Sequence, residues 1–271
     1  MIRRVSENSV PTVLSIAGSD SGGGAGIQAD LKAFASCGVH GMTAITAITA
    51  QNTMGVTAIE SIQPSMIVAQ VRAVADDIGV DAVKIGMLGT VETIAAVDQC
   101  LELVGGVPVV LDPVMVAESG ADLLAVDAKQ SLIELILPRA SVVTPNIPEA
   151  RALTGLGEDA SQEDLAAAVV ALGPAAVVVT GGHSSGLVDV FCDGSRTVPI
   201  EGPRHEATSA HGSGCTHSSA LAAFMAGGMQ PEEAARAARE VASRAVANGL
   251  DSVGSGPGPV DVFGLSRSTR D

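Results

Sequence analysis

Short apolar runs alternate along this chain with longer segments in which apolar residues recur at helical spacing. The runs are continuous and rich in Val, Ile and Ala, which is typical of strands buried on both faces, and they lie near residues 12–17, 43–50, 82–85, 107–111, 141–144 and 175–179. The longer segments predict helices near residues 26–36, 64–77, 91–103, 128–136, 162–172, 216–226 and 231–248. We expect a further short strand near 56–62 and, from the turn signal Asp193-Gly194, a hairpin of 187–191 and 196–200.

This alternation predicts an α/β fold with a mostly parallel central sheet covered by helices on both faces. No linker, repeat or low-complexity tract divides the 271 residues, so we expect a single domain over 1–271 with a flexible stretch at 1–10. Ligands bind such sheets at the carboxyl ends of the strands. Polar residues follow the predicted strands at these ends, namely Asp20, Gln51, Lys84, Asp112, Asn146 with Glu149, and Thr180.

Composition narrows the classes of function. The chain has four Phe and neither Trp nor Tyr, so it lacks the aromatic platforms on which single-stranded nucleic acids stack. A net charge of −15 disfavours capture of DNA, RNA or an anionic membrane. The sequence contains no run of about 18 apolar residues, so we predict no membrane-spanning helix. We therefore expect a cytoplasmic protein with neither a nucleic-acid nor a membrane partner.

The four cysteines show no C-x-x-C pair and no zinc-ligand spacing, which predicts reduced thiols. We expect Cys37, Cys100 and Cys192 to be structural. Cys215 differs because it ends the run His211-Gly212-Ser213-Gly214-Cys215 before an alanine-rich helix. Glycines allow consecutive N–H groups to face one concavity, and the helix start adds the positive end of its dipole. This predicts an anion site at which the thiolate of Cys215 is favoured; the alternative is a helix cap with a buried cysteine.

Two other glycine patterns suggest different functions. The run at 24–29 fits the dinucleotide form G-x-G-x-x-A, but the second strand ends in Ala50-Gln51-Asn52 without the acidic residue that a ribose requires. A glycine turn against which a small ligand lies explains this run better. The run at 182–186 fits the G-x-S-x-G of a hydrolase, but a predicted strand follows it where a nucleophile elbow needs a helix. We interpret it as a loop between strands.

A resemblance to a known family covers nearly the whole chain. Residues 17–32 closely resemble the start of the hydroxymethylpyrimidine/phosphomethylpyrimidine kinases of thiamine biosynthesis, which are ribokinase-like enzymes. The resemblance continues in family order through residues 49–53, 84–88, 111–116, 143–150, 181–183, 211–216 and 258–260. It implies a three-layer ribokinase-like sandwich. It also implies transfer of phosphoryl from ATP, with Mg²⁺, to 4-amino-5-hydroxymethyl-2-methylpyrimidine and then to its monophosphate, in a homodimer.

The resemblance also implies roles for individual residues. Gly212, Ser213 and Gly214 would hold the transferring phosphoryl group, and Cys215 would take the hydroxyl proton. Other positions would contact substrate, nucleotide or metal: Asp30 and Gln51 the edge of the pyrimidine, Ala25, Met87 and Val114 its ring, Asn146, Thr180 and Ala210 the nucleotide, and Asp112 and Glu149 the Mg²⁺. Several have plainer alternatives: a surface acid for Asp30, a turn residue for Gln51 or Asp112, core packing for Met87, and a first-turn helix acid for Glu149.

The chain departs from the family pattern near the expected triphosphate. Thr180 stands where relatives have Lys, Ala210 where they have Thr, and Glu118 where many have Lys or Thr. Because electrostatic stabilisation is usually the largest catalytic effect, we expect weaker use of ATP unless Arg204 or Lys84 compensates. Two alternatives remain open: a pyridoxal kinase of the same branch, and a ligand-binding paralogue with weak turnover. For His183, His211 and His217 we expect only loop packing.

Overall fold

The computed structural model describes residues 10–117, 120–181, 188–203, 205 and 209–265. In this part the strands are β1 (Thr12–Asp20), β2 (His40–Asn52), β3 (Gly55–Ser61), β4 (Ala82–Ile85), β5 (Val109–Leu111), β6 (Val142–Val143), β7 (Val177–Val179), β8 (Asp189–Cys192) and β9 (Thr197–Ile200). The α-helices are α1 (Gly26–Ser36), α2 (Pro64–Asp77), α3 (Val91–Leu103), α4 (Ala128–Ser131), α5 (Ile147–Thr154), α6 (Gln162–Val170), α7 (Ser213–Ala226) and α8 (Pro231–Ala247).

The strands form one sheet in the order β3-β2-β1-β4-β5-β6-β7-β8-β9. The central strands from β2 to β7 pair in parallel. Antiparallel pairs occur at the two edges, where β3 joins β2 and where β8 and β9 follow β7. The predicted hairpin and the mostly parallel sheet are therefore confirmed. The carboxyl ends of the parallel strands lie along the same side of the sheet. This brings together the polar residues that follow these strands.

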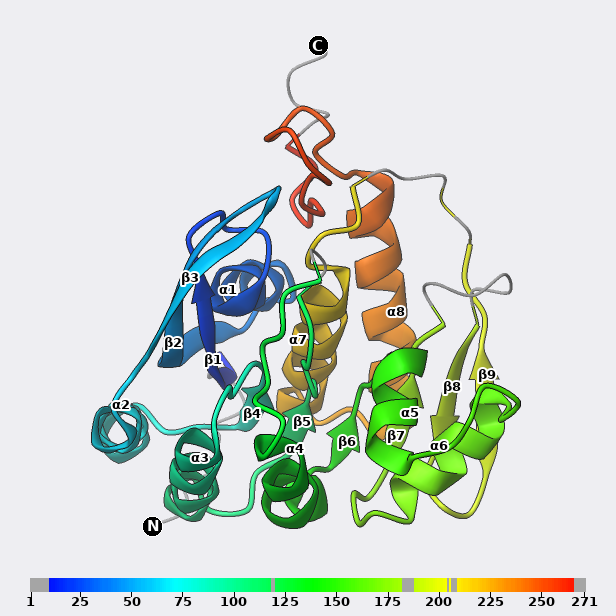
Figure 1. The fold of residues 1–271 in the computed structure, drawn as a ribbon, viewed down its shortest axis with the longest axis horizontal. Helices are drawn as coiled ribbons and strands as arrows, with labels where there is room; N and C mark the ends of the chain where they lie inside the picture. Colours follow the sequence, from blue (N-terminus) through cyan, green and yellow to red (C-terminus); the bar gives the residue numbers. More distant parts are fainter. Residues whose placement is uncertain (1–9, 118–119, 182–187, 204, 206–208, 266–271) are drawn as a thin grey trace.

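Helices cover both faces of this sheet (Figure 1). On one face, Phe34 of α1, Leu221 of α7 and Ala235 of α8 belong to a buried apolar cluster with strand residues such as Val110. On the other face, α2, α3, α5 and α6 contribute to a second cluster. Most side chains buried between the layers are apolar, apart from a polar group around Lys84 and Asp30. The expected three-layer α/β sandwich is confirmed as a single domain.

Element ends differ most from the expectation where glycine or a cap obscures the pattern. The predicted helix at 128–136 is a short α-helix followed by a π-helical turn, Leu132–Ile136, and a 3₁₀ turn, Leu137–Arg139. Helix α5 is not among the helices that the apolar spacing predicts, but Glu149 does lie in its first turn, as the alternative for this residue holds. The helix begins with a capping box between Asn146 and Glu149. Helix α7 begins at Ser213 rather than 216, so Ser213 and Gly214 form its first turn.

All four cysteines are free, and Cys100 and Cys192 are buried, as expected for structural thiols. Within the part of the chain that the structure describes, no helix is long and apolar enough to cross a membrane. Residues 1–9 lie outside the described part, as do Glu118, His183, Arg204 and the whole G-x-S-x-G run at 182–186. The described strand that follows this run, β8, pairs antiparallel with β7.

Candidate active site

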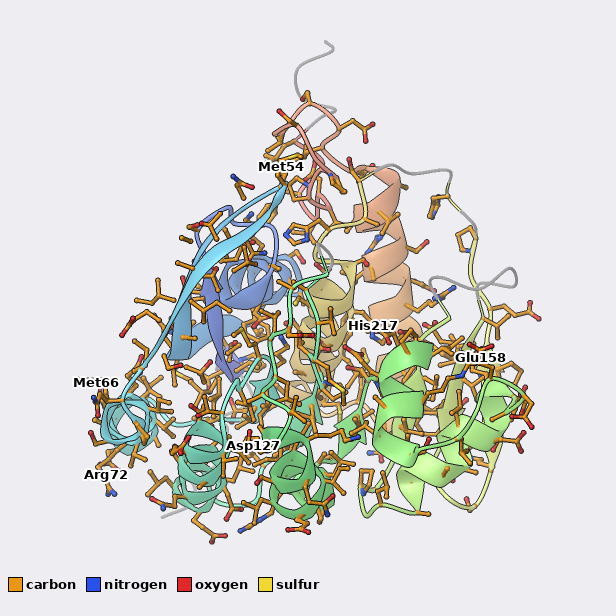
Figure 2. The ribbon with its side chains drawn as sticks, viewed as in Figure 1. Met54, Met66, Arg72, Asp127, Glu158 and His217 are labelled. Atoms are coloured by element: carbon orange, nitrogen blue, oxygen red, sulfur yellow. The ribbon has the colours of Figure 1, made fainter. Side chains whose placement is uncertain are left out.

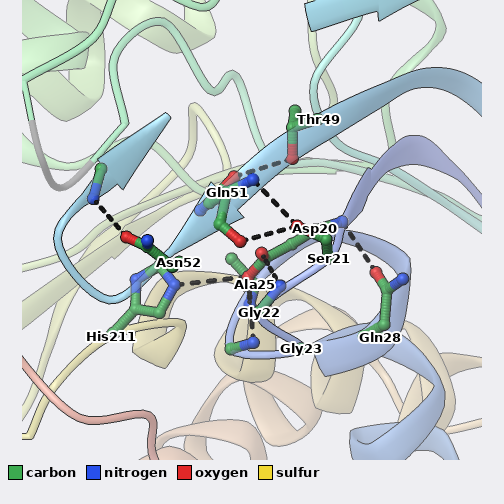
Figure 3. Close-up of polar contacts among 12 residues, drawn as sticks. Asp20, Ser21, Gly22, Gly23, Ala25, Gln28, Thr49, Gln51, Asn52 and His211 are labelled. Atoms are coloured by element: carbon green, nitrogen blue, oxygen red, sulfur yellow. Dashed lines mark hydrogen bonds and ion pairs between the residues drawn. The ribbon is translucent and has the colours of Figure 1, made fainter. Parts of the chain in front are cut away.

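The turn between β1 and α1 is organised by the carboxylate of Asp20 (Figure 3). Oδ1 accepts a hydrogen bond from the N–H of Gly22 at 2.7 Å, and Oδ2 accepts from Gly24 at 2.9 Å and Ala25 at 2.8 Å. Burial opposes ionisation of Asp20, but hydrogen bonds from His211 and the turn amides outweigh it and lower the pKa. The sequence analysis placed Asp20 at a strand end but missed this anchoring role, which an acid before a glycine run could have signalled.

The end of β2 lies against this turn. The N–H of Gln51 donates to Oγ of Ser21 at 2.9 Å, and that hydroxyl donates to the carbonyl of Gln51 at 2.6 Å. Thr49 Oγ1 donates to Oε1 of Gln51 at 3.1 Å. Gln51, which we predict to bind the pyrimidine, is half-buried and fixed through its backbone beside Ala25, another predicted substrate residue. Their substrate roles stay predictions.

Met87 follows β4, which neighbours β1 in the sheet, and Val114 follows β5, the next strand along. Met87 is buried, and its carbonyl accepts a hydrogen bond from Oγ1 of Thr46 at 2.7 Å. A Cβ on Gly18 would lie 3.1 Å from Sδ of Met87, so β1 and this side chain are closely packed. Val114 is half-buried. The fold thus places both residues at the same sheet edge as the β1–α1 turn.

Asp30 lies on α1 with its side chain completely buried. Oδ1 accepts from Nζ of Lys84 at 2.9 Å and from Oγ of Ser219 at 2.7 Å, and Oδ2 accepts from Oγ of Ser15 at 2.5 Å. The alternative of a surface acid is therefore wrong. A direct bond from Asp30 to the pyrimidine stays a prediction, since the visible partners of its carboxylate are all within the protein.

Lys84 is as deeply buried as Asp30, and Nζ also lies 3.9 Å from Oδ2 of Asp112. Burial lowers the pKa of Lys84, but the charges of Asp30, Cys215 and Asp112 more than offset this and raise it. Because its ammonium group is buried at this position, Lys84 cannot be the cation that compensates at the triphosphate. Its charge is instead balanced inside the protein.

The run before α7 forms a tight helix start. Gly212 is the N-cap residue with φ of 82°, in the left-handed region that favours glycine. The carbonyl of Ala210 accepts from the N–H of Ser213, and that of Gly212 accepts from Thr216. The first turn of α7 thus exposes N–H groups without intrahelical acceptors, as at other anion sites. Gly214 is exposed, and nothing lies within 4 Å of the position that its Cβ would take. An anion therefore has room here.

Cys215 occupies the first turn of α7 and is partly exposed. Desolvation raises the pKa of its thiol to about 12, and the charges of Asp112 and Asp30 add to this. Lys84 and the N–H of Gly26 act in the opposite direction without reversing it. Our expectation that the helix start favours the thiolate is therefore wrong for this structure. Its proposed role as proton acceptor stays a prediction.

Asp112 and Glu149 bring two carboxylates together beside this helix start. Asp112 follows β5, is buried, and accepts from Oγ of Ser218 at 3.0 Å. Desolvation first, and then the charge of Asp112, raise the pKa of Glu149 to about 8. Desolvation likewise raises the pKa of Asp112, although Lys84 opposes it. A divalent cation would relieve both effects, so these residues fit Mg²⁺. The described residues hold no cluster of three His, Cys, Asp or Glu side chains for a metal, so water and phosphate oxygens would complete the coordination.

The three predicted nucleotide positions lie along the same edge of the sheet. Asn146 and Thr180 face each other in a parallel bridge after β6 and β7, and Thr180 N–H donates to the carbonyl of Pro145 at 2.8 Å. The side chain of Asn146 caps α5 by accepting from the N–H of Glu149 at 2.8 Å. Ala210 adjoins the start of α7. Contact of these residues with a nucleotide stays a prediction.

One histidine, His217, differs from the expectation of loop packing. His217 lies inside α7, where it is buried, and neither ring nitrogen has a hydrogen-bond partner in the described structure. Burial accordingly lowers the pKa of His217. His211 directly precedes Gly212, and its Nε2 lies 3.5 Å from Oδ2 of Asp20. No local pattern predicts this pair, because 190 residues lie between the two along the chain.

Comparison with known proteins assigns the chain to a family. The family model described as phosphomethylpyrimidine kinase matches residues 20–261. The chain belongs to this family. A hydroxymethylpyrimidine/phosphomethylpyrimidine kinase of Rhizobium meliloti is 50% identical over 257 residues, which cover 92% of this chain and 96% of that relative. As a member of the phosphomethylpyrimidine kinase family, the chain is a phosphotransferase.

Solved structures agree with this fold. The pyridoxal kinase of Staphylococcus aureus in complex with ADP superposes with a TM-score of 0.87 at 34% identity, and 96% of each chain is covered. The phosphomethylpyrimidine kinase of Clostridium difficile gives a TM-score of 0.75 at 40% identity, covering 85% of this chain and 96% of that one. The ribokinase-like architecture is confirmed, and the ADP complex supports use of ATP by the family fold.

Proposed function

We propose that this chain transfers the γ-phosphoryl group of ATP to the hydroxymethyl group of 4-amino-5-hydroxymethyl-2-methylpyrimidine and then to the resulting monophosphate. The observation that carries the proposal is convergence at one sheet edge. The start of α7 at Gly212–Gly214, the carboxylates of Asp112 and Glu149, and the strand ends bearing Gln51 and Met87 lie together at the carboxyl ends of the parallel strands, where an α/β sheet binds its ligands. This arrangement supports the roles in phosphoryl transfer that the resemblance implies.

The residue roles in this proposal are those that the family resemblance implies. N–H groups at the start of α7 would stabilise charge on the transferring phosphoryl group. The thiolate form of Cys215 would accept the hydroxyl proton, and Lys84, whose charge acts to lower the pKa of that thiol, would stabilise this form. Asp112 and Glu149 would hold Mg²⁺, which supplies charge neutralisation to the phosphates. Gln51 would hydrogen-bond the edge of the pyrimidine.

The second candidate is a pyridoxal kinase. It is favoured by the higher TM-score of the Staphylococcus aureus pyridoxal kinase, 0.87 against 0.75 for the Clostridium difficile enzyme. Sequence identity favours the pyrimidine, because relatives that are 50%, 46% and 44% identical are named hydroxymethylpyrimidine/phosphomethylpyrimidine kinases. A binding protein with weak turnover is the third reading, since Thr180 and Ala210 bring no cation to the triphosphate.

We further propose that the chain acts in the cytoplasm as a homodimer. The β2–β3 hairpin exposes apolar side chains: Ile48 is 49% exposed, Ile59, on the opposite face of the hairpin, 42%, and Met54, at the hairpin tip (Figure 2), 66%. A second copy that packs on the hairpin would cover one of these faces. Sedimentation equilibrium of the full chain tests the dimer. Ile48→Lys/Ile59→Lys should yield monomers, and an unaltered monomeric mass for the parent protein would contradict the proposal.

A coupled assay of ADP release tests the catalytic proposal. We expect release with Mg²⁺, ATP and the pyrimidine alcohol to exceed release with pyridoxal, and Cys215→Ala to lower kcat about 10²- to 10⁴-fold. Cys37→Ala is the matched control, because this half-buried thiol lies at the other end of α1 from the turn. If neither alcohol stimulates ADP release while both bind in calorimetry, the chain is a binding protein. Full activity of Cys215→Ala would exclude the role of Cys215.

A further inference from the structure

Asp20 and His211 join two glycine segments that are distant along the chain. Asp20 holds the turn at 22–25 through three backbone N–H groups, and His211 begins the anion loop at 211–214. Their side chains approach to 3.5 Å between Oδ2 and Nε2 (Figure 3). The contact therefore connects the turn beside the predicted pyrimidine residues to the loop beside the predicted phosphoryl group.

The two segments are also packed without spare room. A Cβ on Gly24 would overlap the imidazole of His211 and lie 3.3 Å from Cβ of Pro259. A Cβ on Gly212 would overlap the carbonyl oxygen of Gly24. Because close-packed groups cannot move independently, a displacement of the turn has to move the loop.

The backbone of His211 is also held by the segment around residues 258–260. Its N–H donates to the carbonyl of Gly258 at 3.3 Å, and its carbonyl accepts from the N–H of Val260 at 3.0 Å. The residue is therefore fixed on its backbone while its imidazole reaches across to Asp20. In this arrangement the side chain of His211 links the loop to the turn beside the close approach of the Gly212 and Gly24 backbones.

On the pyrimidine side, the connection continues to Gln51. Ser21 exchanges two hydrogen bonds with the backbone of Gln51, and a Cβ on Gly22 would lie 3.3 Å from the Gln51 carbonyl oxygen. Gly22 in turn donates to Asp20. An unbroken set of contacts thus runs from Gln51 through the turn and Asp20 to His211 and Gly212.

We propose that His211 is a positioning residue that, through Asp20, makes binding of the pyrimidine and binding of the nucleotide mutually reinforcing. This rests on the proposed function. A pyrimidine held by Gln51 fixes the turn, and the fixed turn holds His211 and the anion loop in the geometry that the phosphates require. Linkage makes the effect reciprocal, so the nucleotide tightens the pyrimidine by the same factor.

Isothermal calorimetry of the full chain tests this coupling. The probes are 4-amino-5-hydroxymethyl-2-methylpyrimidine and the non-hydrolysable nucleotide AMP-PCP with Mg²⁺. We expect the Kd of the pyrimidine to fall about 5-fold or more when the nucleotide is present. His211→Leu should bring this ratio close to 1, whereas His211→Gln, which can place an amide nitrogen near the position of Nε2, should retain part of it.

Lys32→Met is the matched control, because Nζ of Lys32 donates to the carbonyl of Gly23 at 2.7 Å and so supports the same turn without reaching the loop. It should keep the full ratio. Circular dichroism and Tm verify that each variant is folded. A full ratio in folded His211→Leu, or a ratio of 1 in the unaltered protein, would overturn the coupling alone. If the pyrimidine does not bind the unaltered protein at all, the proposed function fails as well.

Discussion

Nζ of Lys84 lies 2.9 Å from Oδ1 of Asp30, and neither side chain is exposed to solvent. The pair ties β4 to α1, and Ser219 extends it to α7 by donating to the same oxygen. Asp112 is 3.9 Å away and shares the single ammonium group. Removing one member of a buried pair leaves an uncompensated charge, which is far more costly than removing both.

The pair predicts a large loss of stability on removal of the cation. Lys84→Met should lower the free energy of unfolding by about 3–5 kcal/mol, because Asp30 and Asp112 remain buried without it. Urea denaturation followed by circular dichroism measures this. The double variant Lys84→Met/Asp30→Leu should recover part of the loss. Arg139→Met, which breaks exposed pairs with Asp98 and Glu102, is the control and should change stability little. A Lys84→Met protein as stable as its parent would contradict the interpretation.

The raised pKa of Glu149 predicts a pH dependence of stability. Its carboxyl takes up a proton below about pH 8 in the folded chain, against an ordinary value of 4.5. The stabilisation is complete below 4.5, falls by at most about 1.4 kcal/mol per pH unit as pH rises, and is lost above about 8. Glu149→Gln keeps the acceptor of the capping box without titrating.

The measurement is the difference in free energy of unfolding between the parent and Glu149→Gln from pH 4.5 to 9. The parent should lose stability relative to the variant across this range and then reach a plateau. Added Mg²⁺ at pH 8 should stabilise the parent more than the variant, because only the parent offers the carboxylate. A difference that does not vary with pH would show that the environment of Glu149 does not favour its protonated form.

The raised pKa of Cys215 predicts that its thiol reacts slowly with alkylating reagents. With a pKa of about 12, about one thiol in ten thousand is ionised at pH 8. Alkylation of Cys215 by iodoacetamide, quantified by peptide mass spectrometry, should therefore increase about tenfold per pH unit between pH 7 and 9.5. N-acetylcysteine under the same conditions provides the reference, and its rate should level off near pH 9.5. Levelling of the Cys215 rate below pH 9 would contradict the burial argument.

Hydrophobic periodicity predicted the architecture because continuous apolar runs and helical spacing are local properties of the sequence. Hydrophobic periodicity did not predict helix starts that depend on capping hydrogen bonds or on glycine. Helix α5 is short, and its start depends on the reciprocal bonds of Asn146 and Glu149 rather than on a long apolar face. The start of α7 was placed late because glycine has a low helix propensity, although Gly214 adopts helical structure.

The candidate site was predictable as a list of positions but not as an electrostatic arrangement. A helix start by itself favours a thiolate, yet burial and two carboxylates reverse this at Cys215. Those carboxylates come from α1 and from the end of β5, so their proximity to the thiol depends on the tertiary fold. The same reason hid the burial of Asp30 and the contact between Asp20 and His211.

The glycines of the anion loop predict separable losses of folding and function. In Gly212→Ala the new Cβ would meet the carbonyl oxygen of Gly24, and the residue would keep a φ of 82°, which is strained for alanine. In Gly214→Ala the Cβ would meet nothing within 4 Å, and the helical backbone suits alanine. We therefore expect Gly212→Ala to lower Tm, and Gly214→Ala to leave Tm unchanged or raise it slightly.

The effect of Gly214→Ala on activity should differ from its effect on stability. The methyl group of Gly214→Ala projects from the exposed first turn of α7, where a phosphate would lie, so KM for ATP should rise although the fold is intact. Differential scanning fluorimetry and steady-state kinetics on the two variants measure both effects. Gly228→Ala, at a positive φ of 91° after α7 and with open space around it, controls for backbone strain away from the site. Normal KM for ATP in Gly214→Ala would mean that the phosphoryl group lies elsewhere than at the start of α7.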